Sequence, residues 1–459
     1  MKTDSGTKPK QQFFPASIID EVAYYMEGAG NTTVTYGWIL TLKGEVDSEI
    51  AREALQFTFN YYPKNKCILS KDYPSYKRWF RYCWKYRDSI DHQAIFEERN
   101  VPNPDPEKDP VSYFRELYVP NRIDVTRHIP LKLILIRKPE EVLMLFFHNH
   151  ILSDGRGLLG LLAKFIQFYE DIFYQRNKEA VIPDFQSIPL PDINPPWKDC
   201  SRKHLNIFFR KTMLFLREPV VEVQHNGGTE PTGGLMVVAR VLSPDQFKIL
   251  KSIAKEYQST MNDYMIATMF QTMKKWNAKR GGRLGRFYIN VPVSLRSPDD
   301  ITLSNTLGGI VIAPDPEAMD NKRELLSRVR EQRIFLHEND AAKIDPALAW
   351  PFKFIPHKLK ELLFKHHSHA LYPSLCLSNI GICDYNPSHK DEEGFQYMGP
   401  AKIIGSNVVT AAIPWPQIVI HTYNSRMEVS LSAFRSHFSL DAAKTFLDEY
   451  IKELLTDAT

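Results

Sequence analysis

The chain has 459 residues, of which 43% are hydrophobic and 24% are charged, and its formal net charge is +4 at neutral pH. This composition is typical of a globular protein and argues against a disordered or membrane-embedded one, since no apolar run approaches the ~18–20 residues that span a bilayer. The five cysteines are scattered without a CxxC pair, which predicts neither a disulfide framework nor a structural zinc site. We expect a cytoplasmic protein of two large halves.

The first half, residues 1–176, contains a hairpin and a helix on either side of an unusual polar motif. Residues 130–147 are two runs of Leu, Ile, Val and Phe separated by a charged turn at 138–141, which predicts a β-hairpin. After Gly155, apolar residues recur every three or four positions, as in an amphipathic helix. The motif HNHILSDG, residues 148–155, therefore lies where a strand gives way to a helix.

Residues 177–200 are rich in proline and are predicted to form the crossover to the second half, residues 201–459. The segment HLNIFFRKTMLFLREP that follows is apolar on one side and basic elsewhere. This pattern favours a helix packed on the protein, with a helix lying on a membrane surface as the alternative. A second basic and apolar helix is expected at 352–365, which would suit a hydrophobic substrate.

Strands and helices also alternate through the rest of the second half. We expect strands near 236–242 and 287–293, a helix after Thr260, and a pair of strands in 425–438 followed by a helix over 440–455. Because both halves mix the two kinds of element in this way, the predicted fold class is α/β.

Three kinds of chemistry compete for the motif. A metal site would need a denser ligand set than His148, His150 and Asp154 supply, and the HHSH run at 366–369 follows a helix on a polar turn, so no metal is expected. Covalent catalysis is not supported either, because the chain has no GxSxG elbow and no cysteine beside a base. The remaining chemistry is general-base catalysis by His150, whose imidazole accepts a proton near neutral pH. The alternative is a hydrogen-bonded structural histidine.

HNHILSDG resembles the HHxxxDG motif of the condensation-domain and chloramphenicol acetyltransferase-like superfamily, which includes wax ester synthases, polyketide-associated acyltransferases and alcohol acetyltransferases. Other segments resemble that family in the same order, namely LKGEVDSEIAREAL at 42–55, STMNDYMIA at 259–267, NVPVSLR at 290–296, LSNTLGG at 303–309 and LSNIG at 377–381. The resemblance implies two chloramphenicol acetyltransferase-like halves, arranged as a pseudo-dimer with a central tunnel.

The resemblance also implies roles for single residues. His150 is then the general base, and Asp154 is buried and forms an ion pair with Arg296 from the other half. Backbone N–H groups around Gly155 meet the developing oxyanion. Asn149 stands where the family has the first histidine. Because it points to the opposite face of the strand from residues 148 and 150, we expect it to support the turn by hydrogen bonds.

Other residues are expected beside the substrates. The tunnel lining is predicted to include His148, Asn290, Ser378 and Asn379, although His148 has a second reading as a side chain buried one pleat deeper. The basic segment that contains Lys274, Lys275, Lys279 and Arg280 is either a solvated helix end or a dock for the phosphates of coenzyme A or an acidic carrier protein.

The reaction that the resemblance implies is acyl transfer from acyl-CoA or an acyl carrier protein to a hydroxyl or amine acceptor of hydrophobic character. Coenzyme A or a phosphopantetheine thioester is then a co-substrate. No tightly bound cofactor and no nucleic-acid partner are expected, and peripheral membrane contact stays open. The alternatives are a stand-alone condensation enzyme of the peptide-synthetase type and a non-catalytic scaffold that binds a carrier or a lipid.

Overall fold

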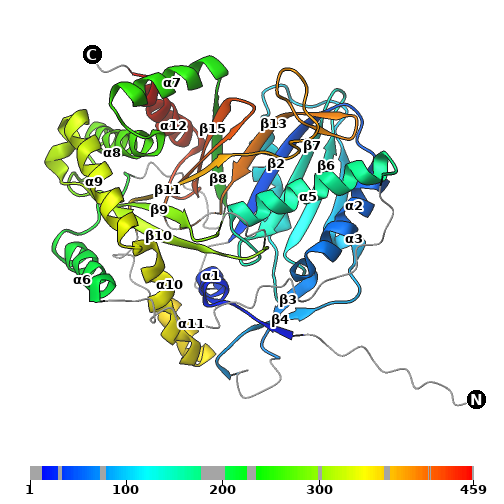
Figure 1. Cartoon of the computed structure of the whole chain (residues 1–459), viewed down its shortest axis with the longest axis horizontal. Helices are drawn as coiled ribbons and strands as arrows, with labels where there is room; N and C mark the ends of the chain where they lie inside the picture. The colour runs from blue at the N-terminus through cyan, green and yellow to red at the C-terminus, as the bar shows by residue number, and fades with distance from the viewer. Residues whose placement is uncertain are drawn as a thin grey trace, which may run out of the picture.

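The computed structural model describes residues 13–28, 34–72, 79–176, 202–224, 234–297, 302–365, 373–411, 413 and 415–456. Within these residues the strands form two six-stranded sheets and one three-stranded sheet. Figure 1 shows the two large sheets next to each other, with helices around them. The predicted α/β class is confirmed, and the sequence elements can be followed through each sheet in turn.

The first sheet has the order β12-β13-β2-β7-β6-β5. Its strands from the first half are β2 (Thr35–Lys43), β5 (Phe96–Asn100), β6 (Leu131–Arg137) and β7 (Val142–Asn149). β6 and β7 pair antiparallel across the predicted turn at 138–141, so the predicted hairpin is confirmed. All residues of β7 are buried, because this strand is central and covered on both faces.

Alternate residues of the first sheet pack on two different layers. One face contacts α2 (Ser48–Tyr61) and α5 (Gly155–Phe173), and the other contacts α4 (Pro110–Tyr118). The short helix α3 (His92–Ile95) precedes β5. α5 begins at Gly155, as its apolar periodicity predicted, so the motif forms the connection between the central strand β7 and the helix that covers it.

Two strands of the first sheet come from the second half of the chain. β12 (Tyr397–Met398) pairs with β13 (Ala401–Val409), and β13 pairs antiparallel with β2. The second half of the sequence therefore completes the sheet of the first half. The predicted crossover at 177–200 lies outside the described residues, and the predicted boundaries remain a prediction.

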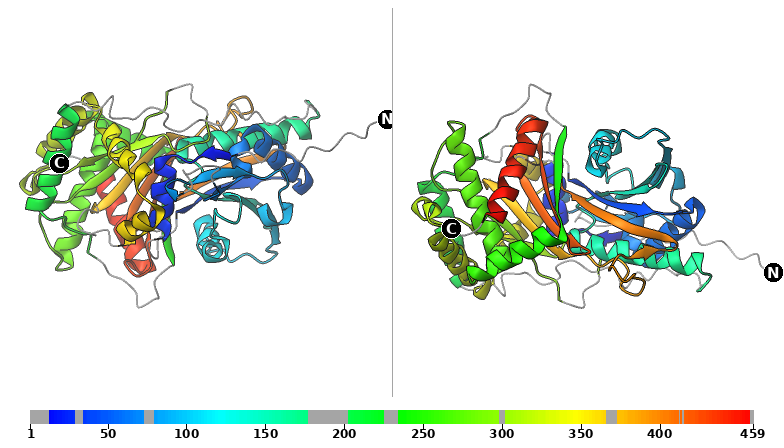
Figure 2. Two further views of the ribbon diagram at one scale, coloured as in Figure 1. Left: turned by 90° about the horizontal axis from the view of Figure 1, so that it is seen from below. Right: turned by 90° about the horizontal axis from the view of Figure 1, so that it is seen from above.

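The second sheet has the order β10-β9-β11-β14-β15-β8. Its strands are β8 (Leu235–Leu242), β9 (Ile289–Ser294), β10 (Leu307–Ile312), β11 (Leu375–Ile382), β14 (Gln417–Tyr423) and β15 (Arg426–Phe434). The helices that pack with it include α7 (Pro244–Glu256), α8 (Met261–Lys279), α9 (Lys322–Glu338) and α12 (Leu440–Leu455). Figure 2 shows most helices of the second half gathered at the end of the molecule away from the first sheet.

Most predictions for the second half are confirmed. The strands near 236–242 and 287–293 are β8 and β9, the helix after Thr260 is α8, and the helix over 440–455 is α12. The pair of strands expected in 425–438 is wrong, since this segment holds only β15, whose hairpin partner β14 precedes it. The turn lies at Asn424 and Ser425, both with positive φ, as a two-residue hairpin turn requires.

The remaining elements lie around the two large sheets. The third sheet contains β1 (Phe13–Pro15), β3 (Cys67–Ser70) and β4 (Cys83–Tyr86). The other α-helices are α1 (Ile18–Gly28), α6 (Arg202–Arg217), α10 (Ile344–Ala349) and α11 (His357–Lys365). Short 3-10 helices are η1 (Pro63–Lys66), η3 (Val119–Asn121), η6 (Pro316–Asp320), η7 (Ala341–Lys343) and η8 (Trp350–Phe354). A search of the described residues finds no helix with both the length and the apolar character to cross a bilayer.

Candidate active site

The motif places its polar residues at a cavity between the two large sheets. The cavity has a volume of about 760 Å³. His148, His150 and Asp154 contribute to its lining from the end of β7 and the turn after it, and β9, β10 and β11 contribute from the second sheet. The segments at 148–155, 290–296 and 377–381, which resemble the family's motifs, therefore meet at one cavity.

His150 is held at the edge of this cavity by contacts on its backbone and its ring. Its backbone N–H donates to the carbonyl of Val34 at 2.7 Å, and its carbonyl accepts from the Asn305 side chain at 2.7 Å. The imidazole packs on the ring of Tyr36, with 4.4 Å between the ring centroids. Burial lowers the pKa of His150 below its ordinary value, although the charge of Asp154 opposes this shift. The ring is therefore neutral near pH 7 and able to accept a proton.

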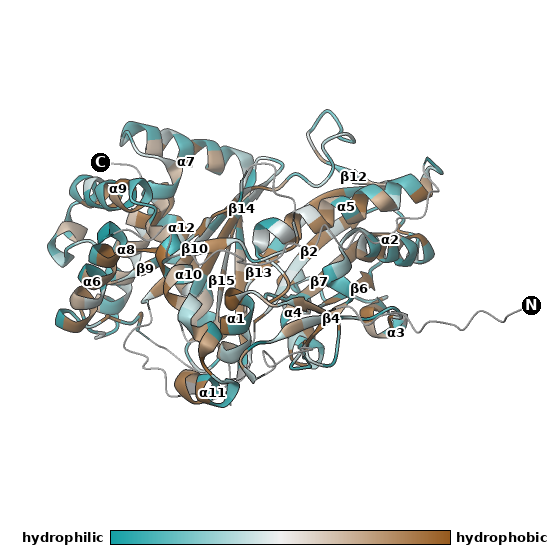
Figure 3. Cartoon of the chain, turned by 60° about the horizontal axis from the view of Figure 1, so that its bottom comes forward, coloured by the Kyte–Doolittle hydropathy of each residue, from teal (hydrophilic) through white to brown (hydrophobic). Residues whose placement is uncertain are grey.

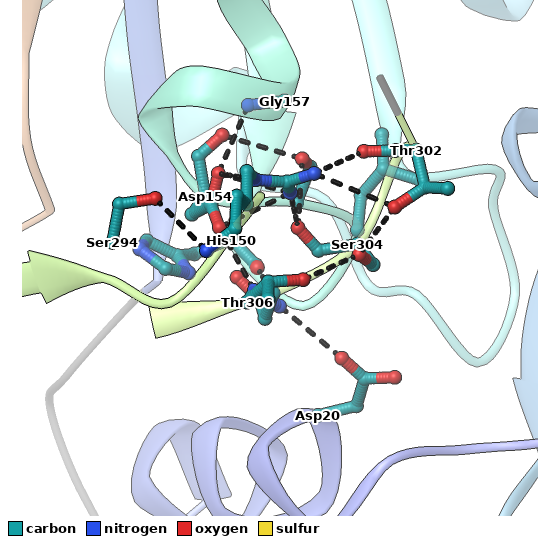
Figure 4. A network of polar contacts seen from close by, with 12 residues as sticks. Asp20, His150, Asp154, Gly157, Ser294, Thr302, Ser304 and Thr306 are labelled. Carbon is teal, nitrogen blue, oxygen red and sulfur yellow. Dashed lines mark hydrogen bonds and ion pairs between the residues drawn. The ribbon is translucent and has the colours of Figure 1, made fainter. Parts of the chain in front are cut away.

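Asp154 has two roles in the same turn. As the N-cap of α5, its side chain accepts from the Gly157 N–H at 2.9 Å. The other carboxylate oxygen accepts from the backbone N–H of Thr306 at 2.8 Å. The carboxylate thus ties the start of α5 to the segment between β9 and β10 (Figure 4).

The predicted ion pair between Asp154 and Arg296 is present. The Nη2 atom of Arg296 lies 3.1 Å from Oδ2 of Asp154, and the two side chains are only 6% and 7% exposed. Nε of the same guanidinium donates to Oδ1 at 3.3 Å, and Nη1 donates to the carbonyl of Thr302 at 2.6 Å. A buried pair of this kind is stable because its donors and acceptors are satisfied by further hydrogen bonds. The pair therefore connects the two halves of the chain at the turn between His150 and the start of α5.

Asn149 and His148 lie as the strand alternation predicted. Asn149 is fully buried, its amide donates to the Glu27 carboxylate at 3.1 Å, and its carbonyl oxygen accepts from the Ile151 N–H at 3.0 Å. It supports the turn, as expected. His148 is both buried and part of the cavity lining, and burial lowers its pKa to about 3. A second neutral imidazole thus stands beside that of His150.

The sequence did not predict three side chains that fix the turn after β7 through hydrogen bonds and an ion pair. Asn305 donates to the carbonyls of His150 and Ile151 and to the Asp20 carboxylate, the last at 3.2 Å. Lys64 donates to the carbonyl of Leu152 at 2.8 Å and lies 3.7 Å from the Asp20 carboxylate. Asn305 belongs to the LSNTLGG segment of the resemblance, but no local pattern marks Asp20 or Lys64, which come from α1 and η1.

The two glycines at the start of α5 differ in what surrounds them. A Cβ added at Gly155 would meet Ile380 at 3.6 Å, which is an ordinary contact, so packing within the protein does not require glycine there. At Gly157 the added Cβ would lie 2.0 Å from Ser153 Oγ and 3.0 Å from Arg296 Nη2. Gly157, which sequence reasoning did not single out, is therefore the position where the turn needs glycine.

The other predicted residues fall into two groups. Asn290, Ser378 and Asn379 all line the cavity. The basic residues of α8 do not line it, and three of them form ion pairs, Lys274 with Asp320, Lys275 with Glu453 and Lys279 with Glu449. The guanidinium of Arg280 stacks on Trp276, 3.2 Å from the ring centroid. Binding of coenzyme A or a carrier protein at this segment remains a prediction.

Within the described ranges, no group of three or more His, Cys, Asp or Glu side chains is arranged to hold a metal ion. The HHSH run at 366–369 lies outside those ranges. The prediction that no metal or tightly bound cofactor takes part remains a prediction.

No protein-family model and no curated protein matches the chain. Solved structures do match it over almost its whole length. It is similar to the trichothecene 15-O-acetyltransferase TRI3 from Fusarium sporotrichioides, with 11% identity, a TM-score of 0.75, and coverage of 98% of this chain and 96% of that one. It is also similar to the first condensation domain of the calcium-dependent antibiotic synthetase, with 12% identity, a TM-score of 0.68, and coverage of 98% and 96%.

A third similar structure is polyketide synthase associated protein 5 from Mycobacterium tuberculosis, with 14% identity, a TM-score of 0.64, and coverage of 97% of this chain and 98% of that one. At such identities the likeness concerns the fold. The predicted resemblance is confirmed at that level. The chain has the two-part α/β fold of the condensation-domain and chloramphenicol acetyltransferase-like structures.

Proposed function

We propose that the protein is an acyltransferase that moves an acyl group from a thioester, carried by coenzyme A or by an acyl carrier protein, to a hydroxyl or amine. The observation that carries this proposal is the neutral imidazole of His150 at a cavity built by both sheets. The names of the similar structures, which include an acetyltransferase and condensation domains, support acyl transfer as the general reaction.

In the proposed reaction, His150 takes the proton of the acceptor while the acceptor's oxygen or nitrogen attacks the thioester carbonyl. The tetrahedral intermediate then collapses, the C–S bond breaks, and the imidazolium returns the proton to the leaving sulfur. A thiol with a pKa near ~8.5 leaves readily, so no acyl-enzyme is needed. The lowered pKa of His150 favours this role because it keeps the base unprotonated near neutral pH.

The start of α5 is suited to the charge that develops on the carbonyl oxygen. Backbone N–H groups in the first turn of a helix have no intrahelical acceptor, and the helix dipole makes that end positive. Gly155 and Arg156 occupy this first turn and line the cavity. The Asp154–Arg296 pair fixes the turn that carries both the base and these amides, so we assign it a positioning role.

The proposal is tested by incubating the protein with acyl-CoA thioesters of several chain lengths and a panel of alcohols and amines, then identifying the products by mass. His150→Gln is expected to lower product formation by at least ~100-fold, because general-base catalysis contributes about 10²–10⁴-fold. His128→Gln is the matched control, since His128 does not line the cavity. No product above the uncatalysed rate with wild type would favour a non-catalytic scaffold, and equal catalysed rates for wild type and His150→Gln would refute His150 as the base.

A further inference from the structure

α6 presents an unusual outer surface. Leu205, Phe209, Met213 and Leu216 are between 44% and 67% exposed, although each is a large apolar side chain. Residues four apart on a helix, such as 205, 209 and 213, lie on one face, and residue 216 falls on the same stripe. The helix therefore carries one continuous apolar stripe that faces away from the protein, which we call the outer stripe of α6. Figure 3 shows α6 at the edge of the second half.

The charge along this helix has a single sign. The segment from Arg202 to Arg217 contains no acidic residue. Arg202, Lys203, Arg210 and Arg217 are exposed, and none of them forms an ion pair with another described residue. Lys211 does form one, with Asp345 at 3.4 Å, from the inner side of the helix. On a helical projection Lys203, Arg210 and Arg217 lie on one side of the outer stripe, and Arg202 lies within the stripe at the start of the helix. An apolar stripe bordered by cations that have no acidic partner among the described residues is the pattern of helices that lie in the interface of an anionic membrane.

The inner face of α6 covers a second cavity. This cavity has a volume of about 380 Å³, and α6 lines it with Ile207, Phe208, Leu214 and Phe215 and, beside them, with Arg210 and Lys211. Ile310, Leu336 and Ala341 line both this cavity and the central one, so the two spaces share a wall. If α6 lay on a lipid surface, this second cavity would be next to that surface. Only the shared wall would separate it from the cavity that His150 lines.

We propose that the outer stripe of α6 and its flanking cations bind the surface of an anionic phospholipid membrane. A second copy of the chain is the competing occupant. In a two-fold dimer the same patch meets itself, which would bring the four exposed cations of each copy into one interface. The positive charge is instead complementary to anionic headgroups. α11 also exposes Leu359, Leu362 and Leu363, but it contains Glu361, which pairs with Lys71, whereas α6 contains no acidic residue.

The test measures co-sedimentation of the full-length protein with vesicles of phosphatidylcholine alone and with added phosphatidylserine, without substrate. We expect at least about ten-fold stronger binding to the anionic vesicles, lost on raising the salt concentration. Phe209→Glu/Leu216→Glu should lower this binding at least about ten-fold, and Arg210→Gln/Arg217→Gln should remove the preference for phosphatidylserine. The matched control is Val241→Glu/Ile249→Glu, at sites 54% and 49% exposed on β8 and α7, and it should bind like wild type.

The proposal is overturned if wild type does not bind anionic vesicles, or if the control loses binding as much as the α6 variants. It is also overturned if wild type is a dimer in solution that Phe209→Glu/Leu216→Glu converts to a monomer, since a second copy then covers the stripe. Melting temperatures of all variants confirm that each is folded. Because no turnover is measured, the result is independent of the proposed acyl transfer.

Discussion

Replacing Gly157 by alanine tests whether the turn between His150 and α5 is as tightly packed as the structure indicates. In most helices this change stabilises the fold by about 1 kcal/mol, because alanine loses less backbone entropy than glycine. Here the new methyl group would meet Ser153 Oγ at 2.0 Å and Arg296 Nη2 at 3.0 Å. We therefore expect the sign of the effect to be reversed.

The expected magnitude follows from what has to move. The Ser153 hydroxyl must rotate away, which breaks its hydrogen bond to the carbonyl of Ser304 and costs about 1 kcal/mol. The guanidinium of Arg296 must shift by a few tenths of an ångström in a packed site, and such overpacking costs about 1–3 kcal/mol. Against the helix gain of about 1 kcal/mol, the net effect is a loss of about 1–3 kcal/mol of folding stability.

Gly160 on the same helix is the matched control. A Cβ there would come no closer than 3.9 Å to the Tyr62 hydroxyl, so Gly160→Ala is expected to stabilise the protein by about 0.5–1 kcal/mol. Urea denaturation and melting temperature measure the two variants side by side. The kcat/KM of Gly157→Ala should also fall by at least about 10-fold, because the Asp154–Arg296 pair that positions the turn is displaced.

A Gly157→Ala protein as stable and as active as Gly160→Ala would refute this reasoning. The variant Ser153→Ala/Gly157→Ala refines the test. It removes the 2.0 Å clash but keeps the 3.0 Å approach to Arg296. We expect it to recover part of the stability lost in Gly157→Ala, and no recovery would mean that Arg296, and not Ser153, accounts for the whole loss.

Three further predictions concern buried charge. Arg296→Ala leaves the Asp154 carboxylate without its guanidinium and should lower the free energy of unfolding by about 3–5 kcal/mol in urea denaturation, whereas a loss below about 1 kcal/mol would contradict a buried pair. Burial lowers the pKa of His150, and only the unprotonated ring accepts a proton, so the acidic limb of kcat/KM should have its midpoint below pH 6.5, and a midpoint above 6.5 would count against His150 as the base. Burial raises the pKa of the Glu428 carboxyl, so this group keeps its proton in the folded protein at pH values where the unfolded chain has released it. The free energy of unfolding of wild type therefore falls as the pH rises. The Glu428→Gln side chain binds no proton, so the melting temperature of this variant minus that of wild type should increase between about pH 5 and pH 8. A difference that does not change with pH would contradict this prediction.

Local patterns in the sequence were sufficient for many elements and for part of the site. The hairpin of β6 and β7, the start of α5 and the span of α12 follow from the spacing of apolar residues, because burying one face of a strand or helix requires that spacing. The Asp154–Arg296 pair was expected from the resemblance of two short motifs. The segment at 425–438 was misread because an alternation of apolar and polar residues does not show which neighbouring strand lies across the turn.

Only the tertiary structure decided how distant segments meet. It pairs β13 from the second half with β2. It also places Asp20 and Lys64 next to the motif turn, which is more than 80 residues away from each of them in the sequence. It also pairs Lys275 with Glu453, an ion pair that the sequence of the basic segment alone does not predict. The physical reason is that apolar periodicity reports which side of each element is buried, whereas the partner on that side is set by packing the whole chain at once.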